Sequence, residues 1–304
     1  MRDGFKSAIL ERAKVDDAFH VLTGDHGYAL FDEFALRYPD RFHNVGVAET
    51  NMIGLAAGMA RNGMRPLVYG LAAFVPNRVF EFIKLQIATD GLSVTMVGDG
   101  AGLVYSTLGV SHQTIEDLAI IGSLPSVTAL APASNEEMQV AVEWAGHSGL
   151  PVYIRMGKSG GSFVGAHPGR SPHPTLVREA SFGPTKRALI AHGSMVSAAL
   201  ELSNGPGQLF DIWSCPTIFP LPESFLEELS FRYEQLVVLE EHGTHGGLGS
   251  NLLFELSKEN ISVEQIGAKL EEERTTGSYP WALRIHGLSD DRILQKLGSL
   301  GFLH

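Results

Sequence analysis

The chain has 304 residues, of which 44% are hydrophobic and 19% are charged, and its formal net charge is -11. This is the composition of a globular protein that is long enough for two domains of ordinary size. The negative charge argues against a nucleic-acid or anionic-membrane partner, although it leaves room for a local basic pocket.

The single cysteine, Cys215, has no partner for an intrachain disulfide. No run approaches the roughly 18 consecutive apolar residues of a membrane-spanning helix. The first residues, Met1 to Lys6, lack the apolar core of a secretion signal. We therefore expect a soluble, cytoplasmic protein without a membrane segment.

In the first half, apolar residues at helical spacing alternate with short apolar runs typical of buried strands. We expect helices over 2–13, after Glu49, and over 74–88, 114–121 and 134–147, and strands over 19–22, 66–69, 94–97, 126–131 and 151–155. Ser134 is a good N-cap for its helix. Such alternation predicts a parallel sheet covered by helices on both faces.

Between Gly157 and Thr185 this periodicity disappears, and glycine, proline and serine become frequent. We interpret residues 158–185 as a linker between a first domain, 1–157, and a second domain, 186–304. In the second domain we expect strands over 188–191, 209–213, 236–240 and 261–266, and helices after residue 194, over 222–231 and after residue 247. The predicted fold class is α/β, with two three-layer domains and mainly parallel sheets.

A short apolar run with Val45 and Val47 leads into a helix of small residues, and Glu49 lies at the junction. Thr50 and Asn51 are placed to help cap that helix. A carboxylate at a helix start is also favoured by the helix dipole alone, so these residues leave a structural and a catalytic role equally open.

The segment from Val45 to Gly58, Val-Gly-Val-Ala-Glu-Thr-Asn-Met-Ile-Gly-Leu-Ala-Ala-Gly, resembles the transketolase segment whose glutamate contacts the aminopyrimidine ring of thiamine diphosphate. Glu240-Glu241-His242, followed by Gly246-Gly247-Leu248-Gly249-Ser250, is similar to a turn of the transketolase C-terminal domain. The resemblance covers nearly the whole chain. It implies a thiamine diphosphate-binding pyrimidine domain at 1–157 and a transketolase C-terminal domain at 186–304.

On this resemblance, Glu49 is the catalytic acid that activates the cofactor, and Phe74 stacks on its pyrimidine ring. His112, in Ser111-His112-Gln113, matches a family histidine that points at the substrate oxygen, and a histidine suits proton transfer near neutrality. Asp25 matches an aspartate near the bound cofactor. From the residues alone, the core explains Phe74 better than a cofactor contact does, and a helix cap explains His112 equally well.

Arg2 and Arg155 match two family arginines that bind the phosphate of a sugar phosphate. A guanidinium can donate two parallel hydrogen bonds to a phosphate, which suits this role. Each arginine by itself is equally consistent with an ion pair at the surface.

Three positions depart from the family pattern by losing a polar side chain: Leu108, Gly100 and Ala29. Leu108 replaces an aspartate that contacts a substrate hydroxyl, so the usual ketose donor is in doubt. The losses favour a smaller, more apolar or deoxygenated donor, or a different acceptor. His26 replaces a leucine and restores one polar group.

Gly98-Asp99-Gly100 resembles the start of the signature with which thiamine enzymes hold magnesium, but the next asparagine, Asn135, is too distant. We therefore expect no metal ligands in this chain. The diphosphate-binding domain is missing as well, so the resemblance implies a partner chain that supplies it together with the Mg²⁺ ligands. The expected assembly is an α2β2 heterotetramer with a homodimeric core and cofactor at the interface between unlike chains.

These observations favour the C-terminal (beta) subunit of a split transketolase, which moves a two-carbon ketol or related unit from a keto donor to an aldehyde acceptor, with a sugar phosphate as substrate. One alternative is a 1-deoxyxylulose-5-phosphate synthase-like or 2-oxo acid dehydrogenase E1 beta-like subunit that uses a 2-oxo acid donor. Another is a non-catalytic regulatory subunit with a degenerate site.

Overall fold

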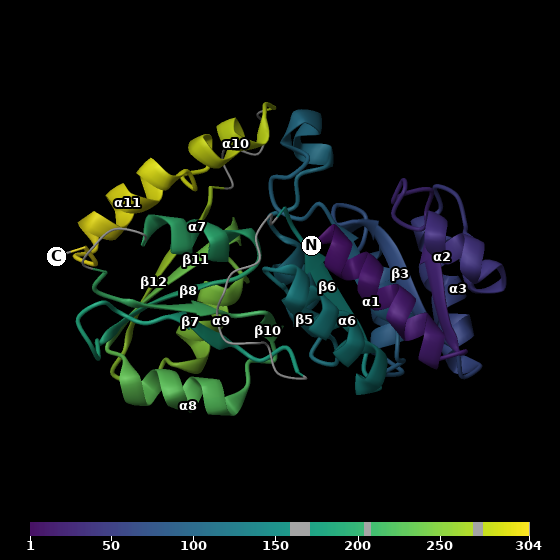
Figure 1. Cartoon of the computed structure of the whole chain (residues 1–304), viewed down its shortest axis with the longest axis horizontal. Helices are drawn as coiled ribbons and strands as arrows, with labels where there is room; N and C mark the ends of the chain where they lie inside the picture. Colours follow the sequence, from purple (N-terminus) through teal and green to yellow (C-terminus); the bar gives the residue numbers. More distant parts are fainter. Residues whose placement is uncertain (159–170, 204–207, 270–275, 304) are drawn as a thin grey trace.

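The computed structural model describes residues 1–158, 171–203, 208–269 and 276–303. They form two α/β halves that lie side by side, each with a mainly parallel sheet between layers of helices (Figure 1). Among these residues, none of the helices combines the length and apolar character needed to cross a membrane.

The first sheet has seven strands in the order β10-β5-β6-β4-β3-β1-β2. Neighbouring strands run parallel, except that β10 is antiparallel to β5. The strands are β1 (Phe19–Thr23), β2 (Phe42–Asn44), β3 (Arg65–Leu71), β4 (Thr95–Asp99), β5 (Thr128–Leu130), β6 (Val152–Met156) and β10 (Thr217–Phe219). Because β10 comes from the second half of the chain, the two halves share this sheet.

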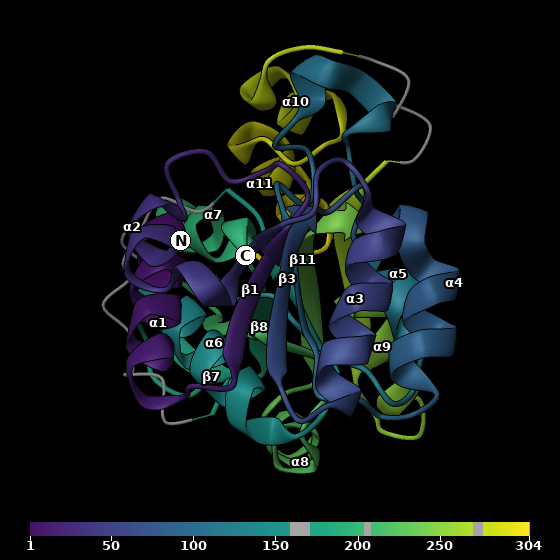
Figure 2. The same cartoon turned by 90° about the vertical axis from the view of Figure 1, so that its right-hand side faces the viewer.

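Helices cover both faces of the first sheet (Figure 2). They are α1 (Arg2–Val15), α2 (Asp32–Arg37), α3 (Glu49–Arg61), α4 (Phe80–Phe82), α5 (Asp117–Gly122) and α6 (Asn135–Ser148). Apolar residues of α1 and α6, such as Ile9 and Met138, belong to one buried cluster, and those of α3, such as Ile53, belong to another. The expected cap on α6 is present, since the Ser134 hydroxyl accepts the N–H of Glu137.

The second sheet has the order β12-β11-β8-β9-β7, in which β7 is antiparallel to β9. The strands are β7 (Thr175–Arg178), β8 (Arg187–Ala191), β9 (Asp211–Ser214), β11 (Gln235–Gly243) and β12 (Ser262–Ala268). The helices are α7 (Ser194–Leu202), α8 (Glu223–Arg232), α9 (Leu248–Glu255), α10 (Tyr279–Ile285) and α11 (Asp290–Ser299). Residues of α7 and α11 share one buried cluster, and residues of α8 and α9 share another. The prediction of two three-layer α/β domains is confirmed.

The segment expected to be a linker contributes more structure than its composition suggests. Residues 159–170 lie outside the described part of the chain, but 175–178 form β7 at the edge of the second sheet. In addition, one buried apolar cluster contains both Ile53 of the first half and Trp213 of the second. The two halves are therefore packed against each other through a common core.

The expected helix over 74–88 does not begin at Phe74. Pro76 follows Val75 through a cis peptide bond, and a proline has no N–H to donate within a helix. The Phe74 N–H donates instead to the carbonyl of Leu71, 2.8 Å away, in a turn after β3. The helical turns that follow are Asn77–Val79, α4 and Ile83–Ala88.

Candidate active site

The candidate residues gather at one edge of the first sheet. Thr23 at the end of β1 pairs with Tyr69 of β3, and Leu71 at the end of β3 pairs with Asp99 at the end of β4. Because these strands are parallel, the segments that follow them leave the sheet at the same edge. These segments carry the predicted positions that come after β1, β3 and β4.

Glu49 is the first residue of α3, as expected, and its side chain is only 7% exposed. The predicted capping by Thr50 and Asn51 is wrong: the N-cap is Ala48, and no side chain caps the helix. The carboxylate of Glu49 instead lies 3.2 Å from Nη1 of Arg78.

Phe74 stands on the turn after β3 and is partly exposed, so it is not a core residue. The guanidinium carbon of Arg78 lies 3.9 Å from the centre of its ring. On another side, the His112 ring approaches edge-on, with 5.5 Å between ring centres and an interplanar angle of 66°. Glu49, Phe74 and His112 are thus brought together, with Arg78 between the first two.

His112 follows a short helical segment, Ser106–Ser111, and is partly buried. Its Nδ1 lies 2.9 Å from the Ser111 hydroxyl, and its backbone N–H donates to the carbonyl of Gly109. Leu108, on the same segment, is 55% exposed. The segment therefore presents a histidine and an apolar surface together.

Asp25 and Arg2 lie nearby on the surface. Asp25 is exposed and adopts a positive φ of 60°, and its carboxylate accepts a hydrogen bond from the Asn44 side chain at 3.2 Å. Arg2 is exposed, and its guanidinium donates to the Tyr28 carbonyl at 3.0 Å. Both are open to a ligand.

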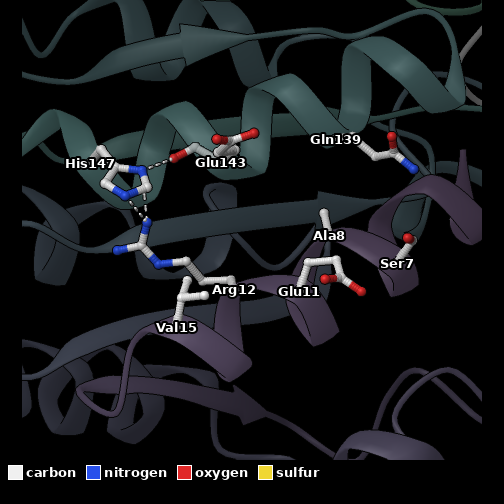
Figure 3. A pocket seen from close by; sticks show the side chains of 8 residues that line it. All are labelled: Ser7, Ala8, Glu11, Arg12, Val15, Gln139, Glu143 and His147. Carbon is white, nitrogen blue, oxygen red and sulfur yellow. Dashed lines mark hydrogen bonds between the residues drawn. The ribbon is translucent and has the colours of Figure 1, made fainter. Parts of the chain in front are cut away.

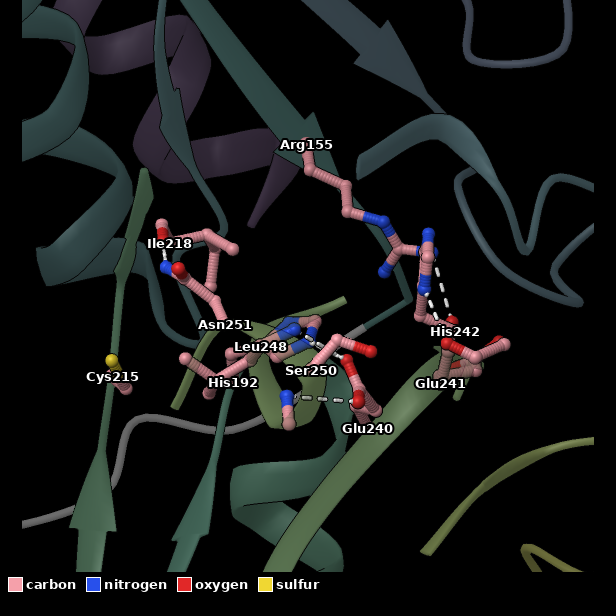
Figure 4. A network of polar contacts seen from close by, with 12 residues as sticks. Arg155, His192, Cys215, Ile218, Glu240, Glu241, His242, Leu248, Ser250 and Asn251 are labelled. Atoms are coloured by element: carbon pink, nitrogen blue, oxygen red, sulfur yellow. Dashed lines mark hydrogen bonds and ion pairs between the residues drawn. The ribbon is translucent and has the colours of Figure 1, made fainter. Parts of the chain in front are cut away.

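Arg155 is buried, which its sequence match did not indicate. Its Nε lies 2.9 Å from the Asp117 carboxylate, and the two side chains are 3% and 0% exposed. Its Nη2 also donates to the carbonyls of Thr114 and Glu241, at 3.2 and 2.8 Å. Arg155 therefore belongs to the packed junction between the halves (Figure 4).

The Glu240–Ser250 turn has a structural role at the same junction. The Glu240 carboxylate accepts the N–H groups of Leu248 and Gly249, at 2.9 and 3.1 Å, and so caps α9. Burial alone would raise the pKa of Glu240, but the nearby His192, whose Nε2 lies 3.6 Å from the carboxylate, His242 and the N–H of Gly249 bring the pKa below its usual value. A side chain at Gly247 would lie 2.2 Å from this carboxylate, so only glycine fits there.

Asp99 forms a polar cluster with His26 and Tyr105. Its Oδ2 lies 2.9 Å from His26 Nε2 and accepts the Tyr105 hydroxyl at 3.2 Å. Burial and the neighbouring Asp99 charge raise the pKa of Tyr105 to about 12. A Cβ at Gly100 would lie 1.9 Å from the Tyr105 ring, so this tyrosine fills the place of the side chain that is missing there.

Packing also requires glycine at position 98, because a Cβ there would lie 2.4 Å from the Tyr153 hydroxyl.

Within the described ranges, no group of three or more His, Cys, Asp or Glu side chains is arranged to hold a metal ion. A separate cleft between α1 and α6 is lined by carboxylates and by Arg12 (Figure 3). Arg12 is already bound there to His147 and Asp16.

The sequence analysis did not identify Arg78 or Asp117. Arg78 is four residues after Phe74, a spacing that suggests a contact only if both residues lie on one helix, and Pro76 interrupts that helix. Asp117 had no sequence signal beyond its position at a helix start. Both contacts depend on segments far apart in the chain.

The family description "Transketolase, pyrimidine binding domain" matches residues 1–161, and "Transketolase, C-terminal domain" matches 184–293. The chain belongs to the transketolase family. That family depends on thiamine diphosphate. The relatives of this chain are enzymes of the transketolase family.

One relative is a 6-deoxy-6-sulfo-D-fructose transketolase subunit of a Clostridium species, 30% identical over 82% of this chain and 78% of that subunit. A 1-deoxy-D-xylulose-5-phosphate synthase of an Azoarcus species is 33% identical over 72% of this chain and 35% of the synthase. Among solved structures, a split-gene transketolase in an inactive β4 tetramer is 28% identical, with a TM-score of 0.85 over 100% of this chain and 98% of that one. The predicted likeness to a split transketolase subunit is confirmed.

Proposed function

We propose that this chain is the C-terminal subunit of a split, thiamine diphosphate-dependent transketolase that transfers a two-carbon unit from a keto donor to an aldehyde acceptor. The observation that carries the proposal is the meeting of Glu49, Phe74 and His112 at one edge of the first sheet. A nearly buried carboxyl, an aromatic face and a histidine are the three groups that such a reaction requires from this half of the enzyme.

Glu49 and Phe74 would hold the aminopyrimidine part of the cofactor. The Arg78 guanidinium between them is flat, carries N–H groups and stacks on a ring, so the gap fits a planar group of the same kind. Bound thiamine diphosphate supplies an electron sink for cleavage of a carbon–carbon bond. Glu49 would hold the proton at the pyrimidine nitrogen, and its low exposure keeps water away from that proton.

His112 would move a proton at the substrate oxygen, because an imidazole exchanges protons close to neutral pH. Its Nδ1 lies 2.9 Å from the Ser111 hydroxyl, which favours one orientation of the ring. The other ring nitrogen is then available to substrate. Ser111 is thus a positioning residue.

A partner chain would supply the diphosphate-binding domain and the Mg²⁺ ligands, and two copies of each chain would form an α2β2 assembly. In support, α3 has an open outer face: a Cβ at Gly54 or Gly58 would meet no atom within 4 Å. Leu55 of α3, Phe82 of α4 and Leu85 of the helical turn after α4 are also exposed. Helices α3 and α4 lie on the same side of the sheet (Figure 2). Such a surface suits close contact with another subunit.

Arg2 is the residue that we assign to the phosphate of a sugar phosphate, since it is exposed near the same edge.

Leu108 supports a second candidate, a 1-deoxyxylulose-5-phosphate synthase-like or E1 beta-like reaction with a 2-oxo acid donor. An exposed leucine in place of a hydroxyl-binding aspartate suits a donor with fewer hydroxyl groups, such as pyruvate. Asp25, which is exposed beside the Glu49 helix, is proposed to line the cofactor site.

The test is reconstitution with the partner chain, followed by Glu49→Gln. We expect thiamine-dependent turnover only in the complex, and a loss of about 10²–10⁴-fold in kcat for the variant. Ketose phosphates and pyruvate as donors separate the two candidate reactions. Full turnover by the single chain would contradict the split arrangement, and an unchanged rate in Glu49→Gln would favour a regulatory subunit instead.

A further inference from the structure

Arg78 makes two contacts at once with residues assigned to the cofactor. Its Nη1 is 3.2 Å from the Glu49 carboxylate, and its guanidinium carbon is 3.9 Å from the centre of the Phe74 ring. The Glu49 side chain is 7% exposed, whereas that of Arg78 is 50% exposed. One end of the pair is therefore nearly buried, and the other reaches in from solvent.

The two groups that Arg78 contacts, a carboxylate and an aromatic ring face, are the groups that a bound aminopyrimidine would need. A flat aromatic ring that bears N–H groups is held by stacking on a second ring and by donating to a carboxylate. Arg78 takes the carboxylate oxygen and the ring face together. Among the described residues, no second cation pairs with Glu49.

We propose that the Arg78 side chain is a resident occupant of the aminopyrimidine position, which the cofactor must displace when it binds. This inference rests on the proposed function. When the site is empty, Arg78 compensates the buried charge of Glu49 and covers the Phe74 face. Its displacement is the step that opens the site.

Three properties make this exchange feasible. The arginine side chain is long, half of it is exposed, and the described residues offer it no hydrogen-bond acceptor other than Glu49. A cation–π contact and a partly exposed ion pair are each weak, so a ligand with the same two contacts can replace them. By contrast, Arg155 has carbonyl acceptors in addition to its carboxylate and cannot leave easily.

The experiment is a calorimetric titration of the complex reconstituted with the partner chain, with thiamine diphosphate and Mg²⁺ up to millimolar concentrations. The variants are Arg78→Ala, which removes the occupant, and Arg78→Lys, which keeps the charge without the flat group. Arg61→Ala is the matched control, because Arg61 is a similarly exposed arginine of α3 that pairs with Asp90 at 2.7 Å. Circular dichroism verifies that each variant is folded.

We expect Arg78→Ala to bind the cofactor about tenfold more tightly than the unchanged chain. This factor corresponds to the combined free energy of one cation–π contact and one exposed ion pair. Arg78→Lys is expected between the two, and Arg61→Ala should equal the unchanged chain. Equal or weaker binding by Arg78→Ala overturns the inference but leaves the proposed function intact. Absence of binding in every variant of the complex would overturn the inference together with the proposed function on which it rests. Failure of the proposed function is seen separately, in the reconstituted complex with Glu49→Gln.

Discussion

Two arginine–carboxylate pairs in this molecule have similar chemistry and opposite settings. Arg78 and Glu49 are 3.2 Å apart, with the arginine side chain 50% exposed. Arg155 and Asp117 are 2.9 Å apart, with both side chains nearly inaccessible. The first pair lies at the open edge of a sheet, and the second lies in the junction between the two halves.

Burial decides what each pair can do. An exposed guanidinium gives up its partner at small cost, because water and a ligand can replace the contact. A buried carboxylate that loses its arginine is left uncompensated in a medium of low polarity, at a cost of several kcal/mol. The edge is therefore suited to exchange, and the junction is suited to holding the two halves in one arrangement.

The largest effect should follow from breaking the junction pair. Arg155→Met leaves Asp117 without a charged partner, and we expect a loss of about 3–5 kcal/mol in the free energy of unfolding. Urea denaturation measures it, with Arg78→Ala as the control that should change stability by less than about 1 kcal/mol. Unchanged stability together with a raised KM for sugar phosphates would instead restore Arg155 as a phosphate ligand.

The next largest effect concerns the open edge and should appear in catalysis alone. His112→Asn in the reconstituted complex should lower kcat by about 10²-fold, because the proton at the substrate oxygen loses its carrier. The urea midpoint of the isolated chain should stay the same, since the His112 side chain is only partly buried. Ser111→Ala is the control and should change kcat by only a few-fold. A parallel loss of stability would instead show that His112 has a structural role.

A smaller effect is expected at the junction from Tyr279→Phe. The Tyr279 hydroxyl donates to the buried carboxylate of Glu241 at 2.8 Å, while the N–H of Leu103 donates to the other oxygen at 2.7 Å. Removing one of these donors should cost about 1 kcal/mol of unfolding free energy. Tyr28→Phe, at a tyrosine that is 95% exposed, is the matched control and should cost nothing measurable.

The last effect comes from Glu137→Gln, which changes the pH dependence of stability. Burial raises the pKa of Glu137 above 4.5, although its carboxylate accepts hydrogen bonds from Ser214 of β9 and from the backbone of Ala133. The folded state then holds this proton more tightly than the unfolded state does. Its contribution is therefore full below pH 4.5 and is lost as pH rises through the pKa of the folded state.

Denaturation of both forms between pH 4 and 7 provides the measurement. The unchanged chain should lose stability relative to Glu137→Gln as pH rises, and a constant difference would contradict the raised pKa. The double comparison with Tyr279→Phe shows whether the Glu137 and Tyr279 contacts act independently.

Most of the regular elements were predictable from the sequence, because their apolar spacing matches the face that each one buries. The strand around Val68 and the Ser134 cap are examples. Three short strands were missed: β2 has only three residues, β7 lay in the expected linker, and β10 has only three residues and joins the sheet of the other half. Strands this short carry too few alternating positions to be recognised, and their partners are distant in the chain.

At the candidate site, the sequence and its family resemblance supplied Glu49, Phe74 and His112, and the structure brings these three together. Arg155 was matched to an open phosphate site, and its burial against Asp117 was not foreseen. Arg78 was not noticed at all. The positions of both arginines depend on which carboxylate reaches them through space.

The sequence by itself determined the α/β class, the mainly parallel character of the sheets and the family of the chain, because periodicity and motifs are local properties of the residues. Only the tertiary structure decided that one arginine is buried in the junction and another is half exposed at the candidate site. The reason is physical: the strength of a charge pair depends on how much water surrounds it, and that is set by the packing of segments far apart in the chain.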